Sequence, residues 1–149
     1  MNLLQTSQHY VDSFHHKLDG RFRVAIPAQW RVSGDEENYY WAWPHPEGCI
    51  AVFPPEMQQE FLEKARAIKQ SDIRGQRMLR QFFGNASKFG CDKQGRILLP
   101  ENLRSHSAIL KDVVFVGLGR NFQIWSEERW TPPESEDFDL LETMAELDF

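Results

Sequence analysis

Residues 91–104 read CDKQGRILLPENLR, and residues 18–31 read LDGRFRVAIPAQWR. A shift of 73 positions brings the two blocks into register, with apolar residues matching apolar residues along the run that follows the charges. Four pairs are identical: Asp19 with Asp92, Arg23 with Arg96, Pro27 with Pro100, and Arg31 with Arg104. We interpret the pattern as an internal duplication, whose two copies are too few and too long for a solenoid.

Each block predicts a turn, a strand and a short helix. Asp92 favours a turn because its side chain can bond to the backbone that follows, and Gly95 supplies a positive φ without steric cost. In the first block, Asp19 and Gly20 are the residues suited to shape the turn. Pro100 cannot extend a strand ladder but suits the first turn of a helix, so PENLR (100–104) predicts a short helix.

The rest of the chain predicts a mixed α and β protein. DVVFVGL (112–118) is the strongest candidate for a buried strand, and NYYWAW (38–43) and CIAVF (49–53) are its counterparts in the first copy. GLGRN (117–121) predicts a hairpin turn. SEDFDLLETMAELDF (135–149) predicts an amphipathic tail helix with acidic residues in its first turn, where the helix dipole favours them.

A pair of helices is predicted between the two copies. The apolar positions of the first recur on one face: Met57, Phe61, Ala65 and Ile68. We expect Glu60 and Lys64 to form a favourable pair on its outer side. The second helix can be capped by Ser71 or Asp72 and runs through Phe83, and Gly84 closes it. Three arginines lie along one side of it: Arg74, Arg77 and Arg80.

Charge is distributed unevenly along the chain, which has 149 residues and a formal net charge of −5 at pH 7. Residues 127–149 hold nine acidic side chains and one basic side chain. Residues 64–104 hold ten Lys and Arg against three Asp and Glu. A basic body with an acidic tail indicates a polyanionic partner, although solvated helix faces produce the same pattern.

Several function classes find no support in the sequence. No apolar run approaches the length of about 18 residues that a membrane span needs, and MNLLQTSQHY (1–10) predicts no signal peptide. Cys49 and Cys91 form no CxxC or zinc pattern, which predicts buried or incidental thiols. The histidines show no metal-ligand spacing. Ser105-His106-Ser107 near Asp112 lacks the turn of a nucleophile, so we expect no enzyme, no metal and no cofactor.

The D-x-x-G-R-(x)₃-P block, used twice around a helical pair, resembles the MraZ family. The likeness runs from about His16 to Trp130, and it is most specific in FFGNASKFGCDKQGRILLPENLR (82–104) and DVVFVGLGRNFQIWSEERW (112–130). Members of this family are bacterial transcriptional regulators built from tandem AbrB-like (SpoVT-AbrB) halves. The resemblance implies an α+β fold with two swapped-hairpin β-barrel halves, a helical hairpin and an acidic tail. The implied boundaries are 13–58 for the first half, 59–85 for the hairpin, 86–130 for the second half and 131–149 for the tail.

The resemblance also implies a function. MraZ proteins assemble into rings and bind short G-containing repeats upstream of the division and cell-wall gene cluster, including their own promoter. We therefore expect a sequence-specific regulator that binds double-stranded DNA, forms a ring-shaped homo-oligomer, contacts no membrane and works in the cytoplasm with the nucleoid. Carried over residue by residue, DNA contact falls on Arg96 and Arg23, with Lys93 and Arg21 as flanking charges. Arginine matches guanine O6 and N7, whereas flanking cations contact phosphates.

The first loop departs from the family pattern. Members carry Asp-x-Lys-Gly-Arg there, whereas residues 19–23 read Asp-Gly-Arg-Phe-Arg, so that Phe22 replaces the turn glycine. A bulky residue at positive φ is strained, and we therefore expect a turn of changed shape in which Gly20 supplies the flexible position. Whether the first loop is a lost DNA site or a retuned one stays open.

Two alternatives stand beside DNA contact. Arg96 and Arg23 could be structural salt-bridge partners of Asp92 and Asp19. AbrB-like folds also occur in antitoxins, so the tail 132–149 could dock a partner protein through apolar anchors at i, i+3 and i+4. Aromatic side chains could stack on bases, but we expect them to be core residues: Phe22, Trp30, Trp41, Trp43 and Trp125.

Overall fold

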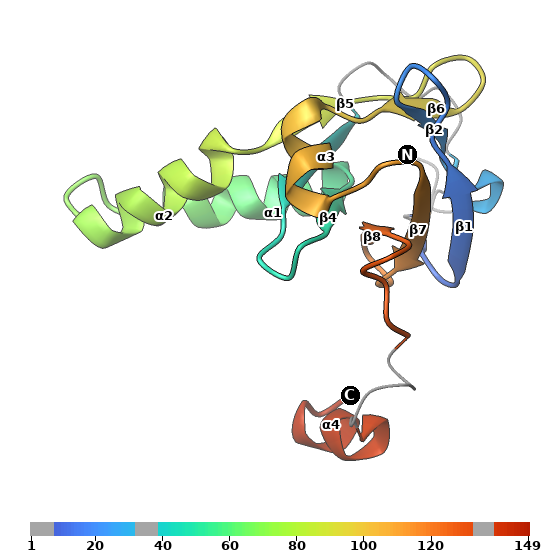
Figure 1. Ribbon diagram of the computed structural model, residues 1–149. Helices are drawn as coiled ribbons and strands as arrows, with labels where there is room; N and C mark the ends of the chain where they lie inside the picture. The colour runs from blue at the N-terminus through green and yellow to red at the C-terminus, as the bar shows by residue number, and fades with distance from the viewer. Residues whose placement is uncertain (1–7, 32–38, 133–138) are drawn as a thin grey trace, which may run out of the picture.

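The computed structural model describes residues 8–31, 39–132 and 139–149, which mix strands and helices as an α+β protein does (Figure 1). The strands are β1 (Ser13–Lys17), β2 (Arg23–Ala25), β3 (Tyr40–Pro44), β4 (Ile50–Phe53), β5 (Ser87–Phe89), β6 (Arg96–Leu98), β7 (Asp112–Gly117) and β8 (Phe122–Ser126). The helices are the 3-10 turn η1 (Ala28–Trp30), α1 (Pro55–Arg66), α2 (Ile73–Gly84), α3 (Glu101–Ser107) and α4 (Leu140–Glu146). In these ranges no helix has the length and apolar composition needed to cross a bilayer.

Strand pairing links the two copies of the duplicated block. Six strands form one antiparallel sheet in the order β1-β7-β8-β4-β3-β5, and β2 pairs with β6 in a separate ribbon. A shift of 73 residues relates β1 to β5, β3 to β7 and β4 to β8, so the strand order reads the same from either edge. The registers agree, since His16 lies opposite Val113 and its counterpart Phe89 lies opposite Tyr40. The first strand of each copy therefore pairs with a strand of the other copy.

The strands do not close into a barrel around each copy. Across the described residues, the six-stranded sheet ends at β1 and β5, and β2 and β6 pair only with each other. The backbone bonds beyond β2 and β6 continue the ribbon instead of joining it to the sheet: Ile26 N–H donates to Gly95 O at 2.9 Å, and Leu99 N–H donates to Phe22 O at 3.0 Å. The expected closed barrels are replaced here by a sheet and a covering ribbon.

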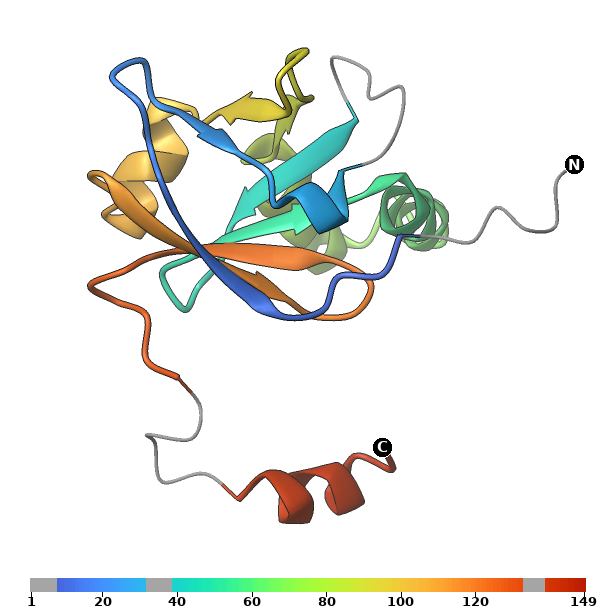
Figure 2. The ribbon, with the colours of Figure 1, turned by 90° about the vertical axis from the view of Figure 1, so that its right-hand side faces the viewer.

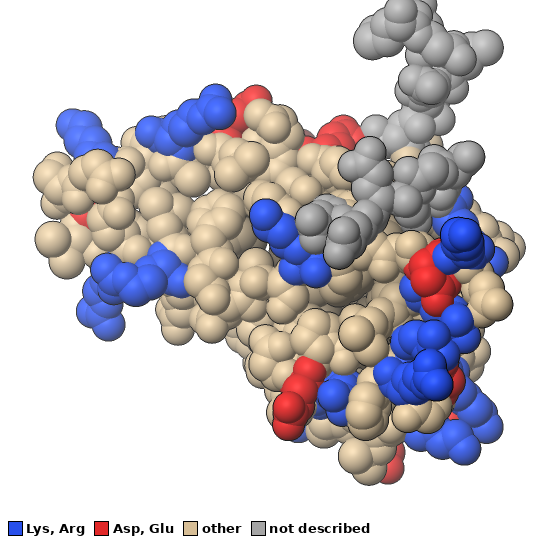
Figure 3. All heavy atoms as spheres, turned by 90° about the horizontal axis from the view of Figure 1, so that it is seen from above, with Lys and Arg blue, Asp and Glu red and all other residues tan. Residues whose placement is uncertain are grey.

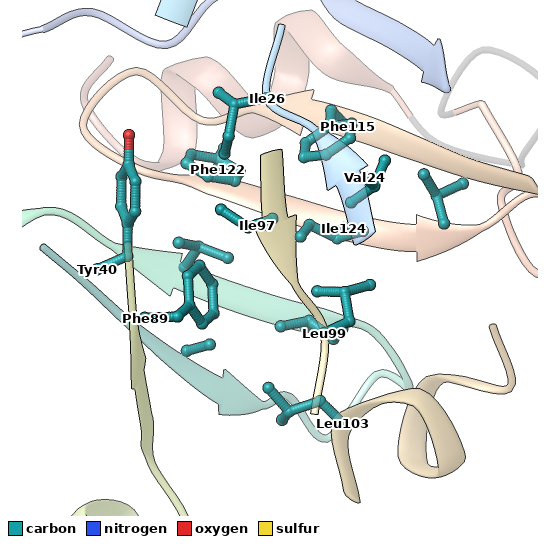
Figure 4. Close-up of a cluster of buried hydrophobic side chains, with 14 of the residues drawn as sticks. Val24, Ile26, Tyr40, Phe89, Ile97, Leu99, Leu103, Phe115, Phe122 and Ile124 are labelled. Atoms are coloured by element: carbon teal, nitrogen blue, oxygen red, sulfur yellow. The ribbon is translucent and has the colours of Figure 1, made fainter. Parts of the chain in front are cut away.

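The β2–β6 ribbon lies over one face of the sheet and closes a common core (Figures 2 and 4). Val24 and Ile97 lie directly opposite each other in the ribbon and are 1% and 0% exposed. They belong to the same buried cluster as Phe115, Phe122 and Ile124 from β7 and β8. Burying one such side chain stabilises a fold by about 1.5–3 kcal/mol. Residues from both copies build this core, so neither copy has a core of its own.

The short helix expected after Pro100 is confirmed as α3, and η1 occupies the corresponding place after Pro27. Both elements bury one large side chain at the same position, Trp30 in η1 and Leu103 in α3. The Trp30 ring lies 5.1 Å from the Phe122 ring, between centroids. Trp30 is thus a core aromatic, as predicted, whereas Phe22, expected in the core, is exposed.

The helices α1 and α2 form a hairpin that projects away from the sheet (Figure 1). Asp72 caps α2, because its Oδ1 accepts a hydrogen bond from Gly75 N–H at 2.8 Å. The rings of Phe61 and Phe82 lie 5.1 Å apart and hold the two helices together. The predicted helical pair and one of its two predicted caps are confirmed.

The partner of Glu60 differs from the prediction. Its carboxylate binds Arg120, which lies in the turn between β7 and β8, and not Lys64 on its own helix. An i, i+4 pair on an exposed helix face contributes only about 0.3–0.5 kcal/mol. The bond to Arg120 instead ties the helical hairpin to the sheet, a contact that helix spacing could not reveal.

The acidic tail forms α4 at its end. Asp139 caps the helix, with Oδ1 accepting from Glu142 N–H at 3.0 Å. The predicted tail helix is confirmed for Leu140–Glu146, while residues 133–138 lie outside the described residues. Both ribbon views show α4 apart from the sheet (Figures 1 and 2). Within the described ranges, no hydrogen bond or ion pair joins α4 to the rest of the chain.

The Cys49 thiol gives a simple chemical test of this packing. Cys49 is fully buried beside β4, and burial raises its pKa to about 12. The thiol therefore stays protonated near neutral pH, and we expect iodoacetamide to leave it unmodified in the folded protein while half-buried Cys91 reacts. Both should react in urea, as read by mass spectrometry of the peptides. Equal labelling of the two cysteines without denaturant would contradict this packing.

Candidate nucleic-acid interface

The loop at residues 92–96 is organised around one carboxylate. Asp92 Oδ1 accepts hydrogen bonds from Gln94 N–H at 2.8 Å and from Arg96 N–H at 2.9 Å. Asp92 Oδ2 accepts from Arg96 Nε at 2.9 Å. Gly95 completes the turn at φ +76°, and its N–H donates to the Asp92 carbonyl at 3.0 Å. One side chain thus holds both the backbone of the loop and the arginine at its end.

The loop at residues 19–23 has the same geometry. Asp19 Oδ1 accepts from Arg21 N–H at 2.8 Å and from Arg23 N–H at 3.0 Å, and Oδ2 accepts from Arg23 Nε at 3.0 Å. Phe22 takes the place of Gly95 at φ +62°, with its N–H bonded to the Asp19 carbonyl at 3.1 Å. The expected change of turn shape therefore does not occur. Gly20 is not among the positive-φ residues of the described chain, so the role expected for it falls to Phe22.

Two features explain how Phe22 keeps a glycine conformation. A left-handed conformation costs an L-residue about 1–2 kcal/mol. The Arg104 guanidinium lies over the Phe22 ring, with Cζ 3.6 Å from the ring centroid, and cation–π contacts stabilise by about 0.5–2 kcal/mol. The hydrogen bonds to the Asp19 carboxylate add to this stabilisation. Both effects offset the backbone strain.

The two aspartates are carboxylates at neutral pH. Hydrogen bonds, first of all from the Arg23 backbone N–H, lower the pKa of Asp19 below its ordinary value. The pKa of Asp92 is lowered in the same way, first of all by the backbone N–H of Arg96. Each aspartate is therefore ionised near neutral pH, and its pair with the arginine stays intact there.

The structure brings the two arginines together. Arg96 Nη1 lies 3.7 Å from Asp19 Oδ2, which links the second loop to the first. The salt bridges considered from the sequence are thus present, and both arginine side chains are still 29% exposed. Among the described residues their hydrogen bonds to side chains use Nε, which leaves the terminal amino groups able to meet a ligand. Salt-bridge formation and ligand contact are therefore compatible.

The flanking residues are placed as charges at the loop tips. Arg21 and Lys93 are both exposed, one in each loop. A shallow pocket between the loops is lined by Arg23, Gly90, Cys91, Asp92, Arg96 and Leu98. Two arginines and the apolar side chain of Leu98 thus line one pocket, which suits an anionic or hydrogen-bonding ligand with some apolar surface.

Sequence reasoning assigned no role to Arg31 and Arg104, although both are identical between the copies. Arg31 Nε donates to Ile26 O at 3.0 Å, and Arg104 Nε donates to Leu99 O at 3.0 Å. Each arginine lies over the positive-φ residue of the other copy's loop, Arg104 over Phe22 and Arg31 against Gly95. The sequence signal was that both copies have an arginine at the same distance after the loop. Only the structure shows that each arginine contacts the loop of the other copy.

Gly95 and Gly20 provide a matched pair of substitutions. A Cβ on Gly95 would lie 2.5 Å from Arg31 Nε at a φ of +76°, whereas a Cβ on Gly20 would meet nothing within 4 Å. We expect Gly95→Ala to lower the free energy of unfolding by about 1–3 kcal/mol, and Gly20→Ala to change it by less than about 0.5 kcal/mol. Urea unfolding followed by circular dichroism measures both. Equal losses would show that Gly95 is not under this constraint.

Basic side chains gather in two areas of one face, over the helical hairpin and over the loops (Figure 3). Three exposed arginines on α2 belong to the hairpin: Arg74, Arg77 and Arg80. The acidic helix α4 lies on the opposite side of the molecule from the loops (Figure 1). Among the described residues, the acidic side chains of α4 therefore lie away from the basic loops.

The residues that resembled a catalytic triad have structural partners. Ser107 Oγ donates to Leu103 O at 2.7 Å, and His106 Nε2 lies 2.6 Å from His45 O. In the described part of the chain, no three side chains among His, Cys, Asp and Glu come together as a metal site would require. These side chains stabilise α3 and its contact with the loop after β3.

Comparison with known proteins adds the family. A family model described as "MraZ protein, putative antitoxin-like" matches residues 82–147, which contain the second loop. A protein of Lachnoclostridium phytofermentans named "Transcriptional regulator MraZ" is 34% identical over 92% of this chain and 93% of its own length. The chain belongs to the MraZ family. The family resemblance predicted from the duplicated block is thereby confirmed.

Other MraZ proteins give the same result. A "Transcriptional regulator MraZ" of Heliobacterium modesticaldum is 35% identical over 94% of this chain and 98% of its own length. One of Natranaerobius thermophilus is 35% identical over 92% of this chain and 94% of its own length. These relatives are named as regulators, a class of protein that is generally not enzymatic. The comparisons therefore support a regulatory role for this MraZ-family chain.

Proposed function

We propose that this chain is a sequence-specific, double-stranded DNA-binding regulator whose two aspartate-held arginine loops contact base edges in the major groove. The observation that carries the proposal is the pairing of Arg23 and Arg96, each anchored through Nε by an aspartate and each partly exposed. A guanidinium fork matches guanine O6 and N7. Anchoring by Asp19 and Asp92 orients each fork in advance, so less conformational freedom is lost on binding.

The charges around the loops support the same proposal. Arg21 and Lys93 are exposed beside the arginines, where they can contact phosphates and position the loops without specifying sequence. The net charge of −5 does not oppose DNA binding, because the acidic residues of 127–149 account for it and α4 lies away from the loops. The duplex therefore meets the basic face of the protein.

One loop pair makes few contacts with DNA, so we also propose that several copies of the chain bind the same DNA together. The chain contains AbrB-like halves at 13–58 and 86–130, a helical hairpin at 59–85 and a tail at 131–149. The exchanged strand pairs between the copies support two such halves that act as one unit. In this proposal the protein forms a ring-shaped homo-oligomer in the cytoplasm, associated with the nucleoid. The ring displays several loop pairs along DNA repeats upstream of the division and cell-wall genes, including its own promoter. Binding several repeats at once raises its affinity through multivalency.

Fluorescence anisotropy tests the proposal directly. The wild-type protein is titrated into a labelled duplex from upstream of its own gene and into a scrambled duplex of the same composition, over a series of salt concentrations. We expect preference for the upstream duplex. The logarithm of the affinity should fall linearly with the logarithm of the salt concentration, since counterions are released from phosphates. Equal affinity for both duplexes at every salt concentration would refute sequence-specific recognition.

The tail supports a second candidate function, the capture of a protein partner as antitoxins do. On α4 and beyond it several large apolar side chains are exposed, among them Leu141 at 77% and Phe149 at 92%. An amphipathic helix with such anchors is a common form of docking segment. The family model that matches residues 82–147 also carries the words "putative antitoxin-like".

Deletion of residues 131–149 separates the two functions. If the loops bind DNA, we expect the truncated protein to keep its affinity for the upstream duplex within about twofold, or to gain affinity because negative charge has been removed. Anisotropy measures the change against wild type. A loss of DNA binding in a truncated protein that still melts cooperatively would show that the tail takes part in recognition.

A further inference from the structure

Phe22 is an exposed aromatic residue in a conformation that favours glycine. It lies at φ +62° in the first loop, where the second loop has Gly95, and its side chain remains 44% exposed. The two loops share every hydrogen bond to their aspartates, so glycine would serve the turn equally well. Strained residues are kept where a surrounding structure and a function require them, and this strain lies beside Arg23.

The ring of Phe22 is held in place. The Arg104 guanidinium covers one face of the ring at 3.6 Å from the centroid, and Arg104 is itself fixed by its bond to Leu99 O. The Phe22 carbonyl accepts from Leu99 N–H at 3.0 Å, which joins the loop to the second strand of the ribbon. The exposed part of the ring is therefore a preorganised apolar surface and not a loose side chain.

Leu98 is a second exposed apolar residue of the ribbon. Leu98 is directly opposite Arg23 in the β2–β6 register and is 57% exposed. The residue opposite Arg96 is Ala25, which is smaller and half-buried. Arg23 thus follows Phe22 in the chain and Arg96 follows Gly95, whereas Leu98 lines one pocket together with both arginines. The two loops share their arginine and differ in apolar surface.

We propose that Phe22, supported by Arg104, contacts the 5-methyl group of a thymine adjacent to the base read by Arg23. This inference rests on the proposed DNA-binding function and adds a difference between the two loops. In the major groove the thymine methyl is the apolar feature of the base pairs, and phenylalanine is among the side chains that contact it. The first loop then reads a methyl-bearing base pair beside its guanine, and the second loop reads guanine without this requirement.

Replacing thymine by deoxyuridine tests the proposal, because deoxyuridine keeps its pairing and lacks only the methyl group. We expect wild type to bind an upstream duplex in which every thymine is deoxyuridine about fourfold more weakly for each thymine methyl group that Phe22 touches. Phe22→Gly should bind the two duplexes equally. This variant is expected to fold, because Gly95 shows that glycine supports the same loop. Thermal melting by circular dichroism checks that it does.

Arg21→Gln is the matched control in the same loop. It removes a charge without touching the apolar surface, so it should weaken binding to both duplexes and leave their ratio as in wild type. An equal thymine-to-deoxyuridine ratio in wild type and Phe22→Gly would overturn the proposal, because the methyl effect would then arise elsewhere.

The outcomes separate this inference from the function on which it rests. If wild type prefers the upstream duplex over a scrambled one but binds thymine and deoxyuridine duplexes alike, the regulator proposal stands and the role of Phe22 fails. If wild type shows no preference for the upstream duplex, the regulator proposal fails first. If Phe22→Gly changes the size of the assembly in light scattering without altering the ratio, Phe22 contacts another protein surface and the proposal is likewise overturned.

Discussion

Arg96→Ala is expected to lower the affinity for the upstream duplex by about 5- to 150-fold, which corresponds to the 1–3 kcal/mol of one bidentate base contact. The Arg96 fork is anchored to Asp92 at 2.9 Å and linked to Asp19 at 3.7 Å, so the wild-type side chain is oriented before DNA arrives. The affinity for a scrambled duplex should fall much less, since non-specific binding depends on phosphate contacts. Anisotropy on both duplexes gives the two numbers.

The structure suggests three further variants for the same experiment. Because the first loop has the geometry of the second, Arg23→Ala should weaken specific binding to a similar extent. Arg96→Lys keeps the charge and loses the fork, so it should resemble Arg96→Ala in specificity. Lys93→Ala, by contrast, should weaken binding to all sequences and reduce the salt slope by about 0.9. Full specificity in a folded Arg96→Ala protein would rule out the loops as the readers.

Trp30→Ala is expected to reduce the free energy of unfolding by about 3–5 kcal/mol, a large share of the stability of a small protein. Trp30 is 1% exposed, and its indole Nε1–H donates to Val11 O at 3.2 Å. Its ring also meets the rings of Phe14 and Phe115, which come from β1 and β7. Removing it leaves a cavity between the ribbon and the sheet, where both copies contribute side chains.

Urea unfolding by circular dichroism is the measurement for this variant, since fluorescence would lose a reporter. The melting temperature should fall by about 2–4 °C for each kcal/mol of stability removed. Trp125→Ala is the control: Trp125 is only half-buried and lies against Trp130, so we expect a smaller loss. Equal destabilisation by the two substitutions would mean that the core does not centre on the ribbon.

The features of the fold that could be predicted are those determined by residues close together in the sequence. The buried strand at 112–118, the short helix after Pro100 and the cap at Asp72 all follow from residues within a few positions of one another, and the structure contains them. The register relation between copies likewise follows the 73-residue shift. The prediction of closed barrels was wrong. Sheet closure depends on hydrogen bonds between backbone groups far apart in the sequence, which local patterns do not reveal.

In the candidate site, too, the local features were predictable and the contacts between distant residues were not. Asp92, Gly95 and Arg96 could be placed in one turn from the sequence alone, because each acts on residues at most four positions away. The prediction for Phe22 and Gly20 was wrong for the opposite reason. Steric rules argue against a phenylalanine at positive φ, and the contact that offsets this strain comes from Arg104 in the other copy.

The sequence by itself determined the duplication, the α+β class and two charged loops of common design, since turn chemistry and strand or helix periodicity are local properties of the chain. Only the tertiary structure decided that the first strand of each copy pairs with the other copy, that Glu60 binds Arg120, and that Arg104 supports Phe22. These contacts join residues far apart in sequence, whose meeting depends on the packing of the whole chain around one shared core.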